Sequence, residues 1–476
     1  MVFGMAKIQK NIISNLLNLW DKRVSLYYLI LLSKMKHKLL IACLCLLASS
    51  LFAQNNGSQN ATVKTQFTLE DCINYAEENN YSLQTAGLNV TSSEISLKQA
   101  KENIAPSISA SATQGLGTNH YQKSVSWNGN YGISAGMTLF NGLSNYNSIK
   151  QSKLQVEQSN LELEQSKNSI RVSIIQAFLN IMMNEDMLAY QQDVLKSSQE
   201  QMEQGEQQFK VGQILESDYK MLQAQYTSDR FNIENTKINI QNNYLTLKNL
   251  LAIDPTREIR IVRPDSATLF RSLEIPGMQE MMDKSTNYLP ELKISQNDVT
   301  NAQYNVKLQK ANYYPSLSLN AGISTGYNNS NLTNNLGWGT QLWHGLGENV
   351  GLNLSIPIYQ RSSVRHNVQQ AQLRVQQAEL SQKETEYQVG RELQQYYLDV
   401  LAAQNDYMTA EAKKEAYEAN YNAYGFKFKY GSVTAVDLIQ QQTNYLNQLN
   451  NYMQAKYTFV LKRKILDVMM GETVRL

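Results

Sequence analysis

Apolar residues recur every seven positions along two long segments in the first half of the chain. One stripe runs from Ile174 to Met202, and the other, after a short turn, runs from Tyr219 to Leu247. The flanking positions are mostly Gln, Asn, Glu, Lys and Ser. A narrow apolar seam with this period predicts helices that pack and supercoil around one another. We therefore expect a coiled-coil hairpin whose first helix, over 144–204, is about 90 Å long at about 1.5 Å per residue.

The second half of the chain repeats the first without a gap across both helices and the turn between them. Gly212 and Asp218 recur as Gly431 and Asp437, each behind the same pattern of an aromatic residue and a lysine. The first stripe recurs from Leu393 to Tyr421, interrupted by Lys414, and the second recurs from Leu438 to Leu466. Self-similarity on this scale means that one structural unit is used twice.

Four other segments alternate small polar with apolar residues, which predicts β-strands because side chains alternate between the two faces of a strand. They cover 107–118 and 129–140 in the first half and 315–327 and 349–359 in the second, with turn-rich loops at 119–127 and 328–347. Each has about the length of a tilted membrane strand. Four strands cannot close a barrel, since the smallest membrane barrels have about eight. The chain must then oligomerise, unless the segments are surface hairpins of a soluble protein.

These patterns divide the chain into two repeats, 67–251 and 278–470, with tips at 209–218 and 428–437. A proline-containing connector, 252–277, joins the repeats, and a tail, 471–476, follows the second. The segment 54–66 before the first repeat is polar, and we expect little regular structure there.

The first 53 residues have the pattern of an export signal. Met35 opens a basic stretch that is followed by an apolar core and small residues, so we expect cleavage after Ala53. Both Met1 and Met35 are candidate start residues. Lipidation at Cys43 is the alternative, although the apolar core before it is short. Two of the three cysteines fall in this segment, so the exported chain keeps only Cys72 and forms no internal disulfide.

Composition and motifs argue against catalysis and nucleic-acid binding. The net charge is +2 and charged residues make up 18% of the chain, so no basic field is available for nucleic acid. Residues 322–326 match the spelling of a nucleophile elbow but lie inside a predicted strand. His120, His344 and His366 have no metal-ligand spacing. We therefore expect no enzyme, no metal and no cofactor. No apolar run after residue 53 approaches the length of a membrane helix.

The duplicated strands and hairpins, with Pro106-Ser107 and Pro315-Ser316 at helix-to-strand entries, resemble the TolC-like outer-membrane efflux proteins over about residues 66–470. The resemblance implies a mainly α-helical homotrimer with a twelve-stranded membrane β-barrel, continued by an α-helical tunnel across the periplasm. It further implies an outer-membrane exit duct for efflux or type I secretion. Its partners would be outer-membrane lipid, a periplasmic adaptor and an inner-membrane pump.

The same resemblance suggests site residues at the hairpin tips. Adaptor docking is expected at Val211, Gly212, Gln213, Tyr430, Gly431 and Ser432. The closed periplasmic aperture is expected at Asp218, Asp437 and Gln440, with Lys427 and Lys429 as candidate cations. The residues alone offer another explanation. Glycine favours a helix C-terminus, a carboxylate is favourable in the first turn of a helix, and Thr434, three residues before Asp437, resembles a capping box.

One further function class stays open at this point. An exported coiled-coil protein that serves as a spacer or adhesin would share the hairpins without forming a channel. The tryptophans Trp127, Trp338 and Trp343 fall in the expected loops, where membrane-interface anchoring and ordinary loop packing are both consistent with the sequence.

Overall fold

A computed structural model describes residues 65–119, 124–264, 275–329 and 337–472. The expected signal peptide with Ala53 and Cys43, most of the polar segment 54–66, His120, part of the connector and most of the tail therefore lie outside the described residues. Among the helices that are described, none combines the length and apolarity needed to cross a bilayer.

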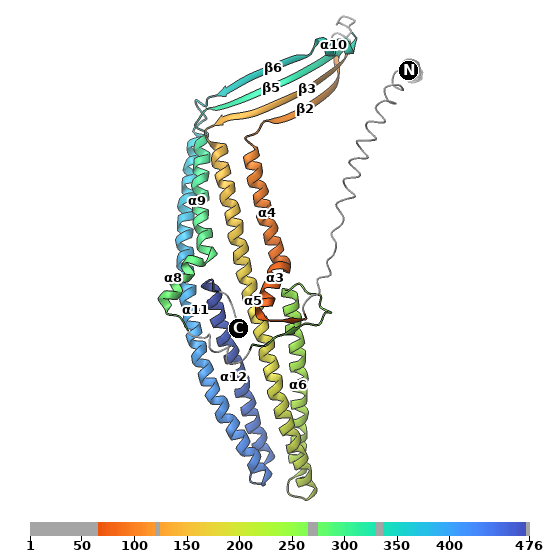
Figure 1. The fold of residues 1–476 in the computed structure, drawn as a ribbon, viewed down its shortest axis with the longest axis vertical. Coiled ribbons are helices and arrows are strands. Elements are labelled where there is room, and N and C mark those ends of the chain that lie inside the picture. The colour runs from red at the N-terminus through yellow and green to blue at the C-terminus, as the bar shows by residue number, and fades with distance from the viewer. Residues whose placement is uncertain (1–64, 120–123, 265–274, 330–336, 473–476) are drawn as a thin grey trace, which may run out of the picture. The chain divides into compact units, whose positions relative to one another are not determined.

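The two halves share one order of main elements, two short helices, two long strands and two long helices, and the second half adds helix α10 between its strands (Figure 1). The first half consists of β1 (Gln66–Phe67), α3 (Leu69–Asn79), α4 (Tyr81–Glu102), β2 (Ser107–Asn119), β3 (Ser124–Asn141), α5 (Ser144–Lys210) and α6 (Glu216–Leu250). After β4 (Arg260–Ile261) in the connector, the second half consists of α8 (Met278–Tyr288), α9 (Pro290–Ala311), β5 (Ser316–Asn329), α10 (Trp338–His344), β6 (Gly347–Ser355), α11 (Ser363–Lys429) and α12 (Ala435–Met469). Helices α5 and α11 have 67 residues each, and α6 and α12 have 35 each, as expected for a duplicated unit.

The four long strands form one antiparallel sheet in the order β2-β3-β5-β6, with the helices running from one of its ends (Figure 1). The central pair, β3 and β5, comes from different halves of the chain, and Ile133 pairs with Ile323. Strands β2 and β6 are the two edges. A separate two-stranded parallel sheet joins β1 to β4 of the connector.

Strand ends differ from the sequence prediction in three places. Strand β3 begins at Ser124, so Trp127, which was expected in a loop, pairs with Leu116 inside the sheet. Strand β6 ends at Ser355, short of the predicted 359, because Pro357 has no N–H to donate to a sheet. The loop expected over 328–347 contains helix α10.

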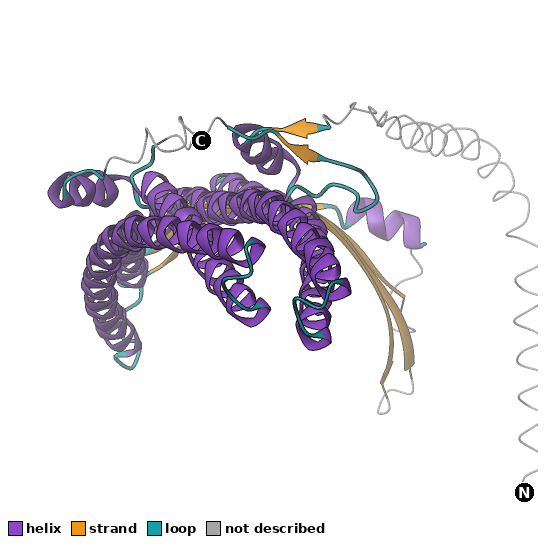
Figure 2. Cartoon of the chain, turned by 90° about the horizontal axis from the view of Figure 1, so that it is seen from below, coloured by secondary structure: helices purple, strands orange, loops and turns teal. Residues whose placement is uncertain are grey.

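Most of the buried core lies where the connector and the short helices meet the middle of the long helices. Its largest fully buried side chains there come from α5, α6, β1 and α8, among them Phe67, Ile174, Phe178, Leu247 and Met281. Viewed from the hairpin ends, the long helices form a curved layer (Figure 2). The side chains of this core hold the two hairpins together at mid-length.

The predicted apolar stripes form the seams of the hairpins, with one correction. In α11 the stripe is buried at Leu393, Val400 and Tyr421, and the interrupting Lys414 pairs with Glu418 at 2.6 Å. In α5 the stripe is buried only near its start. Toward the tip the buried positions are Met187 and Val194, one residue before the predicted Leu188 and Leu195. Neighbouring residues of an α-helix point about 100° apart, so toward its tip α5 buries a different face from the one that the stripe predicted.

Candidate functional site: the hairpin tips and the seam between the hairpins

Each hairpin reverses at a glycine in the left-handed conformation. Gly212 has φ +73° and Gly431 has φ +70°. At the first tip, the N–H of Gly212 donates to the Phe209 carbonyl at 2.9 Å, and the N–H of Gln213 donates to the Gln208 carbonyl at 2.8 Å. This pair of bonds is the Schellman motif, which ends a helix when the residue after its C-cap adopts a positive φ. Both glycines therefore have the structural role that their spacing predicted.

The second tip repeats this geometry bond for bond. The N–H of Gly431 donates to the Phe428 carbonyl at 2.9 Å, and that of Ser432 donates to the Lys427 carbonyl at 2.9 Å. The residue before each glycine points into solvent, since Val211 and Tyr430 are each 77% exposed. Each turn thus presents a large apolar side chain outside the helical packing, at a place where a partner surface can reach it.

The two tips lie side by side. From α5, the Gln204 side-chain amide donates to the Lys429 carbonyl at 3.2 Å. The Gln213 side chain of the first tip lies so close to Gly431 that a Cβ there would be 3.0 Å from its Nε2 atom. The residues that sequence analysis assigned to two separate tips therefore form one continuous surface.

Asp437 caps the returning helix α12. Its carboxylate accepts from the Thr434 hydroxyl at 2.7 Å and from the Thr434 N–H at 3.1 Å, and its own N–H donates back to Thr434 Oγ1. These bonds hold the pKa of the Asp437 carboxyl below its usual value. Asp218 occupies the matching turn of α6, but that helix begins without a side-chain cap. Of the two aspartates, only Asp437 forms a capping box.

The candidate cations do not lock Asp437 within one chain. The Lys427 ammonium lies over the Tyr424 ring, 4.9 Å from its centroid, and Lys429 is exposed. In the part of the chain that the structure describes, no ion pair joins either lysine to Asp437. Gln440 is also exposed and donates to Asn444 along its own helix at 3.3 Å. The Asp437 carboxylate is therefore exposed, and none of the described residues neutralises it.

A buried polar cluster that the sequence patterns did not predict lies between the hairpins. Asp229 of α6 is 3% exposed and accepts from the Ser198 hydroxyl of α5, from Gln442 Nε2 of α12 at 2.7 Å and from Gln225 Nε2 at 2.9 Å. Burial raises the pKa of the Asp229 carboxyl, and these three donors oppose the shift. Gln442 is fully buried, and its Oε1 atom has no hydrogen-bond partner. The cluster joins the first hairpin to the second at one point.

A signal for this cluster was present in the sequence. Asp229 follows Leu222 by seven residues and precedes Thr236 by seven, and all three are buried. They form the second column of the α6 seam, beside the column that begins at Tyr219. A carboxylate at a seam position of a coiled coil requires a buried partner.

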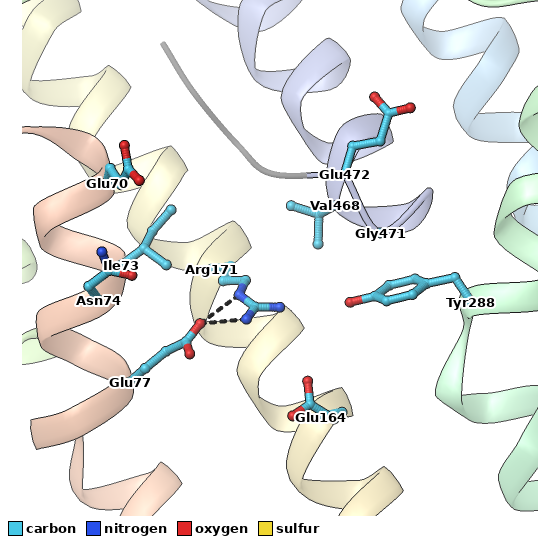
Figure 3. A pocket seen from close by; sticks show the side chains of 10 residues that line it. All are labelled: Glu70, Ile73, Asn74, Glu77, Glu164, Arg171, Tyr288, Val468, Gly471 and Glu472. Carbon is cyan, nitrogen blue, oxygen red and sulfur yellow. Dashed lines mark hydrogen bonds and ion pairs between the residues drawn. The ribbon is translucent and has the colours of Figure 1, made fainter.

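A cavity of about 360 Å³ lies at mid-length, between α3, α5, α8 and the end of α12 (Figure 3). The Arg171 guanidinium there binds Glu77, with Nη2 to Oε1 at 2.6 Å. Glu472 at the rim pairs with Lys284 at 2.9 Å. These carboxylates already have cationic partners, and the described residues contain no group of His, Cys, Asp and Glu that could hold a metal. The cavity is a packing gap between the two repeats.

Comparison with protein families decides the membership of the chain. Residues 72–252 and 285–472 match the family described as outer membrane efflux protein, so each repeat matches by itself. The chain belongs to the outer membrane efflux protein family. As a member, it serves as an exit duct of the outer membrane whose helices extend into the periplasm, which confirms the function and localisation that the resemblance implied.

Solved structures share the fold of this outer membrane efflux protein. The CmeC outer membrane channel of Campylobacter jejuni is 17% identical with a TM-score of 0.71, and the match covers 85% of each chain. The open-state MtrE outer membrane channel of Neisseria gonorrhoeae is 17% identical with a TM-score of 0.69, over 85% of this chain and 89% of that one. The outer membrane protein VceC of Vibrio cholerae is 16% identical with a TM-score of 0.66, over 85% and 96%. A comparison with curated proteins gives no match.

Proposed function

We propose that three copies of this chain pool their sheets into one twelve-stranded barrel, with β6 of each copy pairing with β2 of the next. The observation that carries the proposal is the contrast between the two faces of the sheet, together with its two open edges. In lipid the edge N–H and C=O groups of a lone four-stranded sheet have no partner, and each costs several kcal/mol. Pairing between copies gives the N–H and C=O groups of both edge strands hydrogen-bond partners.

One face of the sheet consists of small polar residues alone. Every second residue along each strand is Ser, Thr, Asn or Gly. This holds from Ser107 to Gly117 on β2, Ser126 to Thr138 on β3, Ser316 to Asn328 on β5 and Gly347 to Ser355 on β6. This face has no charge and no large apolar side chain, which suits a water-filled interior. We assign it to the lumen.

The opposite face is apolar and suits lipid. Its side chains include Ile133, Met137, Leu319, Leu352 and others at the same alternate positions. Its polar exceptions, Gln114, Thr118, Thr325 and Glu348, all lie near the loop end of the sheet. The pattern is that of membrane barrels, in which apolar residues face outward and polar residues face inward.

Aromatic side chains mark the two edges of the apolar band. The loop-end row contains Trp127, Tyr131 and Tyr327, and Phe140 lies at the helix end, where it pairs with Leu317. From Tyr131 to Phe140 the strand rises about 23 Å along the membrane normal, at about 3.3 Å per residue and a tilt of about 40°. Membrane barrels have an apolar band of about 25 Å between aromatic girdles. The dimensions of the sheet therefore fit one outer membrane.

The helices then extend from the inner edge of this band as a tunnel, and the hairpin tips form its periplasmic end. We infer that a periplasmic adaptor linked to an inner-membrane pump docks at Val211, Gly212, Gln213, Tyr430, Gly431 and Ser432. The support is the continuous surface of the two tips and the exposed Val211 and Tyr430. Small molecules or proteins would pass through this duct without chemical change, and no catalysis is required of the chain.

We further infer that Asp437 of the three copies forms a ring of charge at the inner mouth, with Asp218, Gln440, Lys427 and Lys429 around it. The capping box fixes the position of the Asp437 carboxylate, and no cation within the described ranges pairs with it. Like charges in a narrow mouth attract counterions, so this end of the duct should prefer cations.

Conductance in a planar bilayer tests the duct. Protein purified from outer membranes should form trimers in detergent and conduct ions as discrete steps. A water-soluble species without conductance would instead support the exported coiled-coil spacer.

A further inference from the structure

Helix α10 stands at the loop end of the sheet, in the connection between β5 and β6 (Figure 1). It is fixed to β5 by two hydrogen bonds. The Thr325 hydroxyl donates to the Leu342 carbonyl at 2.5 Å, and Gln341 Oε1 accepts from the N–H of Asn328 at 2.9 Å. Strand β6 begins its pairing one step lower, where Gly347 pairs with Ser324. Helix α10 therefore lies beside the outer end of β5, beyond the last residue of β5 that pairs with β6.

The register of the sheet gives the level and the side on which α10 lies. Thr325 pairs with Tyr131 and Asn328 pairs with Asn128 on β3, so the helix stands level with the loop-end row of aromatic residues. Thr325 belongs to the apolar face of the sheet, like Ile323 and Tyr327. Since the Leu342 carbonyl accepts from the Thr325 side chain, α10 contacts the apolar face of the sheet at this point.

Helix α10 exposes two tryptophans and carries no acidic residue, lysine or arginine. Trp338 is 69% exposed and Trp343 is 79% exposed in the single chain. Residues 337–347 contain no Asp, Glu, Lys or Arg. An indole combines a large apolar body with one N–H donor, a combination that favours the headgroup region at the edge of a bilayer.

We propose that α10 lies in the headgroup region of the outer leaflet, with Trp338 and Trp343 as its lipid anchors. The proposal rests on the proposed function, since it requires the apolar face of the sheet to contact lipid. It commits to lipid as the partner because α10 continues that face outward, at the level of its aromatic row. An anchor at this level on each of three copies would fix the depth of the barrel in the membrane.

Quenching of tryptophan fluorescence by brominated lipid tests the proposal. Variants of the full-length protein would keep one tryptophan, Trp338 or Trp343, with every other tryptophan of the chain changed to Phe. Two reference variants on a tryptophan-free background add Leu352→Trp, in the middle of the apolar face, or Val211→Trp, at a hairpin tip. Their positions are 67% and 77% exposed, similar to the α10 tryptophans. Each assembly is reconstituted into phosphatidylcholine vesicles brominated near the headgroup or deep in the acyl chains.

Emission from Trp338 and Trp343 should fall about twofold with shallow bromines and less with deep ones, because indoles favour the interface. Leu352→Trp should show the reverse order, and Val211→Trp should respond only to aqueous acrylamide. If Leu352→Trp responds to bromine while the α10 tryptophans respond only to acrylamide, α10 lies in water and the proposal is wrong. It is equally wrong if they respond to neither quencher, because a second copy then covers them. If Leu352→Trp also fails to respond to bromine, the proposed membrane sheet itself is wrong.

Discussion

Replacing Asp229 tests whether the buried polar cluster holds the two hairpins together. In Asp229→Ala the carboxylate that accepts from Ser198, Gln442 and Gln225 is lost. Ser198 still donates to the Val194 carbonyl, and Gln442 still donates to Ser198 Oγ at 3.0 Å, so the donors keep part of their bonding. Hydrogen bonds to charged groups contribute about 1.5–3 kcal/mol each, and the partial compensation leaves an expected net loss of about 2–4 kcal/mol.

Hydrogen exchange of the assembled protein, read by mass spectrometry on peptides from α6 and α12, measures this loss locally. At tenfold per about 1.4 kcal/mol, protection around residues 225–236 and 438–449 should fall by about 30-fold to 700-fold. Asp406→Ala on α11, an exposed aspartate, is the matched control and should leave both peptides unchanged. Equal protection in Asp229→Ala and the control would refute the role of the cluster.

The conservative variant Asp229→Asn separates hydrogen bonding from charge. Its amide oxygen can accept as the carboxylate does, and its N–H₂ can donate to Gln442 Oε1, which has no partner now. We expect a loss below about 1 kcal/mol. Burial raises the pKa of Asp229 above its unfolded value. The stability that Asp229 contributes is therefore complete at acid pH and decreases as pH rises through the folded-state pKa. Protection in Asp229→Asn, relative to wild type, should rise with pH, and a pH-independent ratio would contradict the assignment.

Two further predictions concern the tips. Gly431→Val should impair adaptor-dependent export while trimers persist, because a β-branched residue is strained by about 1–2 kcal/mol or more at a φ of +70°. The control is Gly390→Val in helix α11, where an added Cβ would have no neighbouring atom within 4 Å. Equal export from both variants would contradict the docking role. Asp437→Asn should lower the cation preference in reversal-potential measurements. An unchanged preference in Asp437→Asn would leave this residue only as part of the helix cap.

Features that depend on local sequence were predictable. Gly212 and Gly431 were identifiable as helix ends because only glycine adopts a positive φ at little cost. Alternation gave the four strands because each side chain of a strand belongs to one face or the other. The capping box at Asp437 followed from the spacing to Thr434.

Features that depend on distant packing were not predictable. The cluster of Asp229, Ser198 and Gln442 draws on three helices and both halves of the chain, so no local pattern joins its members. The shift of the α5 seam to Met187 and Val194 depends on how the neighbouring helices pack against α5, which the sequence of α5 alone does not specify. Helix α10 was missed because seven residues give too short a pattern to separate a helix from a loop.

Disulfide cross-linking between sheet edges tests the shared barrel most directly. Cys72, the only cysteine among the described residues, is buried and its thiol pKa is raised to about 12, so it should not interfere. Cysteines introduced together at Thr113 on β2 and at alternate positions of β6, Asn349, Gly351 or Asn353, should yield covalent trimers in outer membranes for at least one combination. A control variant with the Thr113 cysteine on β2 and no cysteine on β6 should yield no covalent trimer. If no combination links one chain to the next while the protein is in the membrane, the strands are not pooled between copies and the duct is wrong.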